Sequence, residues 1–189
     1  RFVALNSYEN RVYQLELEDG SMVVGKFYRP GRWSRQAIEA EHRFIQQLAE
    51  AEVPVAAPLS LGDGRTVGDV LGILYAVFPR VAGRSPQELS DEQARMLGRL
   101  VARMHNIGAQ ELASDRPSLT PLTFGTENLQ LLVEGQHVHE AVRASYAATV
   151  QALVQRIEPL FAWVPAHRIH GDCHLGNLLW TRQGPVLVD

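Results

Sequence analysis

The sequence predicts an α+β fold in which a strand-rich first part precedes a helix-rich second part. Alternating polar and apolar side chains near the start are typical of half-buried strands. Capping residues followed by helical periodicity indicate helices at 34–49, 90–108 and 140–161. A Pro-Arg-Val-Ala-Gly run at 79–83 is typical of a linker. We therefore expect two lobes, residues 1–79 and residues 80–189.

The elements of the first lobe follow from turn and cap chemistry. Residues 2–5 are an apolar run, and residues 11–18 alternate as a strand does. Asp19-Gly20 is a hairpin signal, which leads into a second long strand at 21–28. Ser34 is expected to cap the following helix. An apolar strand at 72–78 completes an antiparallel sheet.

The second lobe starts with a Ser-Asp-Glu-Gln capping box at Ser90. Residues 110–137 show no clear period, and Pro159 lies inside the long helix that follows. The chain closes with short apolar pieces on either side of a Gln-Gly-Pro turn at 183–185. Both ends of the chain resemble cuts within a longer protein, so we expect a C-terminally incomplete second lobe and little activity from this stretch alone.

Composition places the chain among ordinary globular proteins. Of the 189 residues, 46% are hydrophobic and 21% are charged, which excludes a disordered chain. The net charge of −3 gives no general attraction for nucleic acid or anionic membrane. Cys173 is the single cysteine, which excludes an internal disulfide and fits a reducing compartment. As a free cysteine, it is expected to be buried.

The segment from His170 to Asn177 carries the clearest chemistry. Its spacing, H-x-D-x-x-x-x-N, is that of a kinase catalytic loop, in which the aspartate orients the attacking hydroxyl. Asp172 is therefore the candidate catalytic base, and Asn177 is a candidate Mg²⁺ ligand. Asp189 follows an apolar run, where a second metal ligand with a catalytic role would sit. A zinc site at His170, Cys173 and His174 is the weaker interpretation, because no second ligand pair is evident.

Two further residues complete the kinase pattern. Lys26 lies in a V-x-x-K run on a predicted strand, and Glu41 follows on the next helix. A kinase holds the ATP phosphates with such a lysine and holds the lysine with such a glutamate. No glycine-rich loop precedes Lys26, so Ser7 and Asn10 in the first turn are expected to cover the phosphates. The strand at 75–79 is placed to meet the adenine.

These motifs resemble the aminoglycoside phosphotransferase-like kinases, whose signature is H-G-D-x-H-x-x-N. The resemblance covers most of the chain, most closely to a bacterial branch of serine/threonine protein kinases, at residues 5–14, 26–30, 53–58, 76–79 and 170–174. It implies a protein-kinase-like two-lobe fold and an ATP- and Mg²⁺-dependent, cytoplasmic enzyme of the stress response. Carried over, Asp172 accepts the proton, Asn177 and Asp189 bind Mg²⁺, and Ser7 and Lys26 contact ATP.

Three functions remain open at this point. The first is a protein kinase that acts on serine or threonine acceptors, with neither nucleic acid nor membrane as a partner. The second is a small-molecule kinase of the same fold, with an aminoglycoside, amino alcohol or sugar acceptor. The third is a nucleotide-binding pseudokinase scaffold, which the intact Lys26, Asp172, Asn177 and Asp189 disfavour.

Overall fold

The computed structural model describes residues 1–5, 7 and 9–188. Contacts divide the chain into two compact units. The first comprises residues 1–115 and the segment from His167 onward, and the second is Arg116–Ala166. No helix in the described ranges has the length and apolar character needed to cross a membrane.

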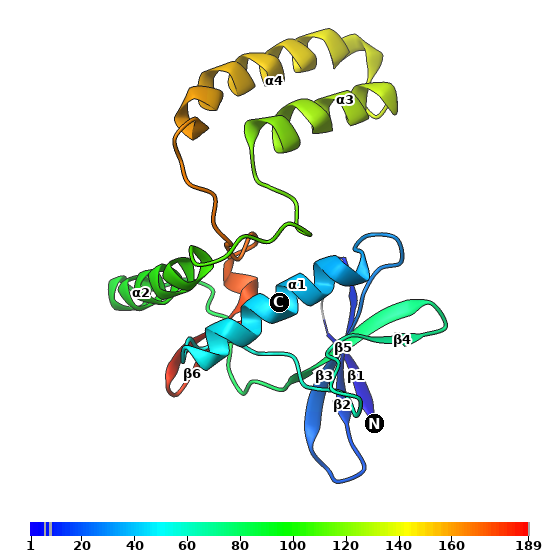
Figure 1. The fold of residues 1–189 in the computed structure, drawn as a ribbon, viewed down its shortest axis with the longest axis vertical. Helices are drawn as coiled ribbons and strands as arrows, with labels where there is room; N and C mark the ends of the chain where they lie inside the picture. Colours follow the sequence, from blue (N-terminus) through cyan, green and yellow to red (C-terminus); the bar gives the residue numbers. More distant parts are fainter. Residues whose placement is uncertain (6, 8, 189) are drawn as a thin grey trace. The chain divides into compact units, whose positions relative to one another are not determined.

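A five-stranded antiparallel sheet forms one half of the first unit (Figure 1). The strand order is β1-β2-β3-β5-β4, so β3 is the central strand. The strands are β1 (Phe2–Leu5), β2 (Arg11–Glu16), β3 (Met22–Phe27), β4 (Gly68–Val70) and β5 (Ile73–Pro79). Sequence alternation predicted β1, β2, β3 and β5 to within two residues at either end.

Helix α1 (Arg35–Glu50) packs on one face of this sheet. Ser34 caps it as predicted, because its hydroxyl accepts a hydrogen bond from the Ala37 N–H at 3.1 Å. Ile38 is fully buried against a cluster from the sheet and the loop before β4, formed by Tyr28, Val67, Ala76 and Phe78. The face that carries Tyr28 and Ala76 is therefore the inner face of the sheet.

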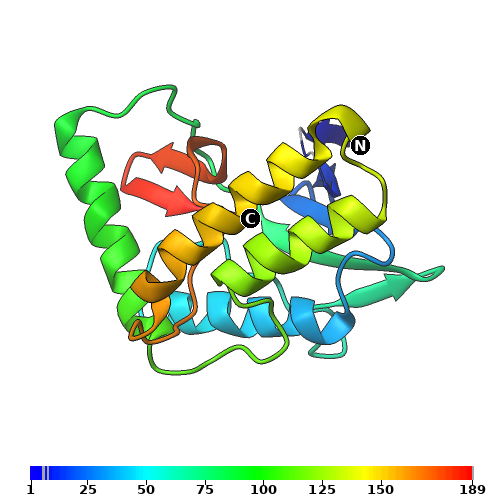
Figure 2. The same cartoon turned by 90° about the horizontal axis from the view of Figure 1, so that it is seen from above.

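A second core joins the far end of α1 to helix α2 (Asp91–Gly108) and to the hairpin of β6 (Leu178–Thr181) and β7 (Gly184–Leu187). Figure 2 shows the backbones of these elements. The capping box predicted at Ser90 is present. The buried members are Phe44, Leu48, Val53, Leu100, Met104, Leu178 and Leu187. This core supports both strands that follow the catalytic-loop motif.

The second unit contains two helices, α3 (Glu127–Glu134) and α4 (Glu140–Phe161). The sequence predicted α4, but no helix was predicted within residues 110–137, where α3 lies. A π-helical turn, η1 (Leu122–Thr126), leads directly into α3. The wider π turn shifts the spacing of the apolar residues, which hides the 3.6-residue period on which sequence prediction depends.

Candidate active site

Lys26 lies on the central strand β3, opposite Val12 of β2 and Ala76 of β5. Its side chain is only 9% exposed, and its Nζ is 3.9 Å from Glu41 Oε1 on α1. The ring of Tyr28 is also close, with its centroid 5.2 Å from Nζ. The ion pair expected from the sequence is thus present, and an aromatic face adds a cation–π contact.

The helix phase decides which glutamate meets the lysine. Glu39, two residues before Glu41, lies 4.0 Å from Arg35 on the same helix. Gly25, beside the lysine, is explained by cross-strand packing. A Cβ on Gly25 would come within 3.0 Å of the Leu15 side chain, so a bulkier residue would force that leucine to move.

A buried histidine, His42 of α1, contacts Tyr28. The sequence analysis did not identify it. His42 Nε2 is 3.1 Å from the Tyr28 hydroxyl, and its Nδ1 is 2.8 Å from Thr66 Oγ1. Burial, together with the nearby positive charge of Lys26, lowers the pKa of His42 to about 4. The imidazole is therefore neutral at physiological pH. A histidine among apolar helix positions was the only available signal.

The turn between β1 and β2 carries the two residues predicted to cover the phosphates. The Asn10 N–H donates to Ser7 Oγ at 3.3 Å, and Asn10 Oδ1 accepts from the Arg29 N–H at 3.3 Å. The first bond lies within the turn, and the second ties the turn to the chain just beyond β3. Asn6, which belongs to the same predicted turn, lies outside the described residues. A role for Ser7 and Asn10 toward ATP stays a prediction.

The catalytic-loop motif folds into a tight turn around Asp172. Gly171 has a φ of +83°, which side-chain-bearing residues rarely adopt. The Asn177 side-chain amide donates to the Asp172 carbonyl at 3.0 Å and to its Oδ2 at 3.2 Å. His174 Nε2 lies 3.5 Å from the same carboxylate oxygen. The loop thus brings the predicted base and the predicted metal ligand into direct contact.

Asn177 is suited to hold a hard cation such as Mg²⁺. Its NH₂ group faces Asp172, while its Oδ1 has no hydrogen-bond partner among the described residues. The Val188 N–H donates to the Asn177 carbonyl at 3.0 Å, so the chain end next to Asp189 lies against the loop. Asp189 itself lies outside the described residues. An amide oxygen and a carboxylate are the ligand types that Mg²⁺ prefers.

The zinc interpretation gains no support. Among the residues that the structure describes, no three His, Cys, Asp or Glu side chains are grouped to hold a metal ion. The expectation that Cys173 is buried is wrong, because its side chain is exposed on the loop. Partial desolvation, and then the charge of Asp172, raise the pKa of its thiol. The reactive thiolate is therefore disfavoured at neutral pH.

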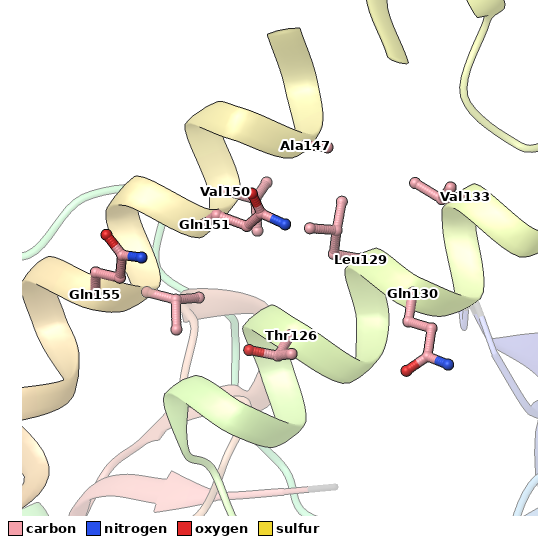
Figure 3. Close-up of a pocket in the computed structure, with 9 residues that line it drawn as sticks. Thr126, Leu129, Gln130, Val133, Ala147, Val150, Gln151 and Gln155 are labelled. Atoms are coloured by element: carbon pink, nitrogen blue, oxygen red, sulfur yellow. The ribbon is translucent and has the colours of Figure 1, made fainter. Parts of the chain in front are cut away.

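The second unit holds a groove of about 640 Å³ between α3 and α4 (Figure 3). Leu129 of α3 and Val150 of α4 point toward each other across it. Three glutamines border these apolar side chains, at positions 130, 151 and 155. None of the predicted site residues that the structure describes lines this groove.

A buried strand lysine paired with a helix glutamate, in one unit with the Asp172–Asn177 loop, defines a kinase-like phosphotransferase fold. The chain belongs to the phosphotransferase enzyme family, which it matches over residues 2–189.

Curated relatives include stress response kinase A of Escherichia coli K12, which is 41% identical over 193 residues. The serine/threonine protein kinase RdoA of Salmonella typhimurium LT2 is 39% identical over 186 residues. Each match covers 98% of this chain and 56% of the relative. The chain therefore spans about half the length of the curated relatives that it matches.

Solved structures share the fold at lower identity. The amicoumacin kinase hAmiN, in complex with AMP-PNP, Ca²⁺ and Ami, has a TM-score of 0.82 at 22% identity. The microcompartment-associated aminopropanol kinase has a TM-score of 0.70 at 21% identity. Both likenesses cover 100% of this chain, and they cover 57% and 63% of the two neighbours.

Proposed function

We propose that the protein is an ATP-dependent phosphotransferase that transfers the γ-phosphate of ATP to a hydroxyl group. The observation that carries the proposal is the Lys26–Glu41 ion pair on a buried strand, in one compact unit with the Asp172–Asn177 contact. Lys26 binds the α- and β-phosphates, and Glu41 holds its ammonium in place. Asp172 orients the acceptor hydroxyl and accepts its proton.

The same residues fit a magnesium-dependent reaction. Asn177 and Asp189 would hold Mg²⁺, which supplies charge neutralisation for the transferred phosphate. Ser7 and Asn10 close over the nucleotide from the first turn. Residues 1–79 then act as the nucleotide-gripping lobe, and residues 80–189 supply the linker and the catalytic loop. The chain's place in the phosphotransferase family supports ATP as the donor.

The proposed acceptor is a serine or threonine of a protein, in a cytoplasmic stress response. Support comes from relatives named stress response kinase A and serine/threonine protein kinase RdoA, at 41% and 39% identity. The alternative is a small-molecule acceptor, which the names of the amicoumacin and aminopropanol kinases favour. A pseudokinase scaffold is disfavoured because Lys26, Asp172, Asn177 and Asp189 all match the residue types of the kinase pattern.

One transfer assay tests the activity and separates the acceptors. The full-length protein is incubated with γ-labelled ATP and Mg²⁺, with generic protein acceptors in one arm and aminoglycosides and aminopropanol in the other. We expect labelled phosphoserine or phosphothreonine in the first arm only, lost in Asp172→Asn and kept in the exposed control Asp115→Asn. Label in the second arm only would reassign the acceptor, and Asp172-independent label would contradict the proposed site.

A further inference from the structure

Arg168 precedes the catalytic loop and lies at the junction of three parts of the first unit. Its N–H donates to the carbonyl of Gly108, the last residue of α2, at 3.2 Å. A Cβ on Gly108 would clash with the Arg168 carbonyl oxygen. The chain therefore crosses the end of α2 at a distance that only glycine permits. This contact fixes the backbone four residues before Asp172.

The Arg168 side chain extends from this crossing to α1 and is buried there. Its Nη1 donates to Gln47 Oε1 at 2.6 Å, and its guanidinium lies 4.4 Å from the ring centroid of Phe44. Nη2 donates to the Ile107 carbonyl at 3.3 Å, and Nη1 lies 3.6 Å from Glu111 Oε2. One arginine thus joins the loop's entry to both helices.

The partners on α1 lie close to the glutamate that holds the lysine. Phe44 and Gln47 follow Glu41 by about one and two helical turns. We infer that Arg168 is a positioning residue for the proposed transfer reaction, which ties the catalytic loop to the helix that holds Lys26. Through this tie, Asp172 and the Lys26–Glu41 pair keep a fixed separation. The inference rests on the proposed function, and Arg168 does not touch the reacting atoms.

Stability alone does not account for an arginine here. Its Nε is buried and has no hydrogen-bond partner among the described residues. Apolar replacements of buried ionic groups are often neutral or stabilising, so a folded core could do without this charge. A planar guanidinium, however, reaches several acceptors in fixed directions, which a lysine cannot do. That geometry suits a residue whose task is to set a distance between elements.

The test compares Arg168→Met with Arg103→Met in the full-length protein. Arg103 is the control, an exposed arginine whose Nη2 joins α2 to the end of α1 through the carbonyls of Ala51 and Glu52. We expect Arg168→Met to lower kcat about 10–100-fold, since small misplacements of catalytic groups have effects of this size. The KM for ATP should change less than about twofold, because Lys26 and Glu41 are untouched. Arg103→Met should keep kcat.

Amide hydrogen exchange over residues 170–177 gives a readout that needs no activity. Faster exchange there in Arg168→Met than in Arg103→Met supports the tie between the loop and α1. Equal kcat and equal exchange in the two folded variants overturn it. If Arg168→Met does not fold, Gln47→Leu takes its place, with a smaller loss of kcat expected and an unchanged kcat contradicting the inference. Asp172→Asn is run alongside, because full activity there would instead refute the proposed function.

Discussion

Lys26 and Asp172 lie in contrasting surroundings. The Lys26 side chain is 9% exposed and contacts Glu41 of helix α1, from another element, as well as the ring of Tyr28 just after its own strand. The Asp172 side chain is 75% exposed, and among the described residues it contacts Asn177 and His174 of its own loop. Tertiary packing thus fixes the lysine, whereas local bonds fix the aspartate. Changes at Lys26 should therefore affect binding and folding together, and changes at Asp172 should affect chemistry alone.

The largest expected effect is that of Asp172→Asn on turnover. Loss of the proton acceptor should lower kcat by about 10²–10⁴, the usual range for acid–base catalysis. Because the side chain is exposed, the midpoint of thermal unfolding should stay within about 2 °C of the wild type. Steady-state kinetics and calorimetry on the same preparation check both points. A large fall in the midpoint would show that the loop contributes to folding.

Lys26→Met should have the next largest effect, on nucleotide affinity. A charged hydrogen bond to phosphate contributes about 1.5–3 kcal/mol, so the Kd for ATP should rise about 10–100-fold. The variant also removes the ammonium that lies 3.9 Å from the half-buried Glu41 carboxylate, which should lower the free energy of unfolding measurably. Titration calorimetry with ATP tests the affinity. Arg11→Met, an exposed change on the neighbouring strand, should alter neither quantity.

Lowering the pH should lower the free energy of unfolding through His42, the buried histidine near Lys26. Its pKa is about 4 in the folded protein and about 6.5 when unfolded, so the unfolded state binds the proton first as the pH falls. The stability that the neutral imidazole contributes is present above pH 6.5 and declines toward pH 4, by up to about 3 kcal/mol. Urea unfolding of the wild type and His42→Gln across this range measures the difference. Parallel pH profiles in the two proteins would contradict it.

Cys173→Ser should have the smallest effect. The thiol is exposed beside Asp172, and its raised pKa keeps it protonated at neutral pH. We expect kcat within about twofold of the wild type, because serine preserves the size of the side chain. Peroxide should inhibit both proteins equally. If the serine variant instead resisted peroxide, oxidation of the Cys173 thiol would be identified as the cause of the inhibition.

The same contrast explains what could be predicted from the sequence. Ser34 and Ser90 identified helix starts because capping depends on neighbouring residues alone. The Asp172–Asn177 spacing was informative for the same reason, since five residues of one loop bring the two side chains together. Lys26 and Glu41 were predicted as a pair only because their order along the chain fits a known chemical pattern.

The supporting residues could not be found in this way. His42 meets Tyr28 only after α1 packs on the sheet, and Arg168 meets Gln47 across 121 positions of sequence. Buried histidine and arginine are exceptions to the usual preference of these residues for the surface. No local pattern distinguishes them from solvated side chains. The prediction for Cys173 was wrong in the opposite sense, because a residue type that is usually buried lies in an exposed loop.

The central claim is that Lys26 binds ATP and Asp172 performs the chemistry. The most direct test measures ATP affinity and single-turnover transfer on one variant of each residue. The full-length Lys26→Met and Asp172→Asn proteins are compared with the wild type. We predict a crossed pattern, in which Lys26→Met weakens ATP binding and Asp172→Asn lowers the transfer rate at saturating ATP with unchanged affinity. Unchanged ATP affinity in Lys26→Met, or an unchanged transfer rate in Asp172→Asn, would contradict this assignment.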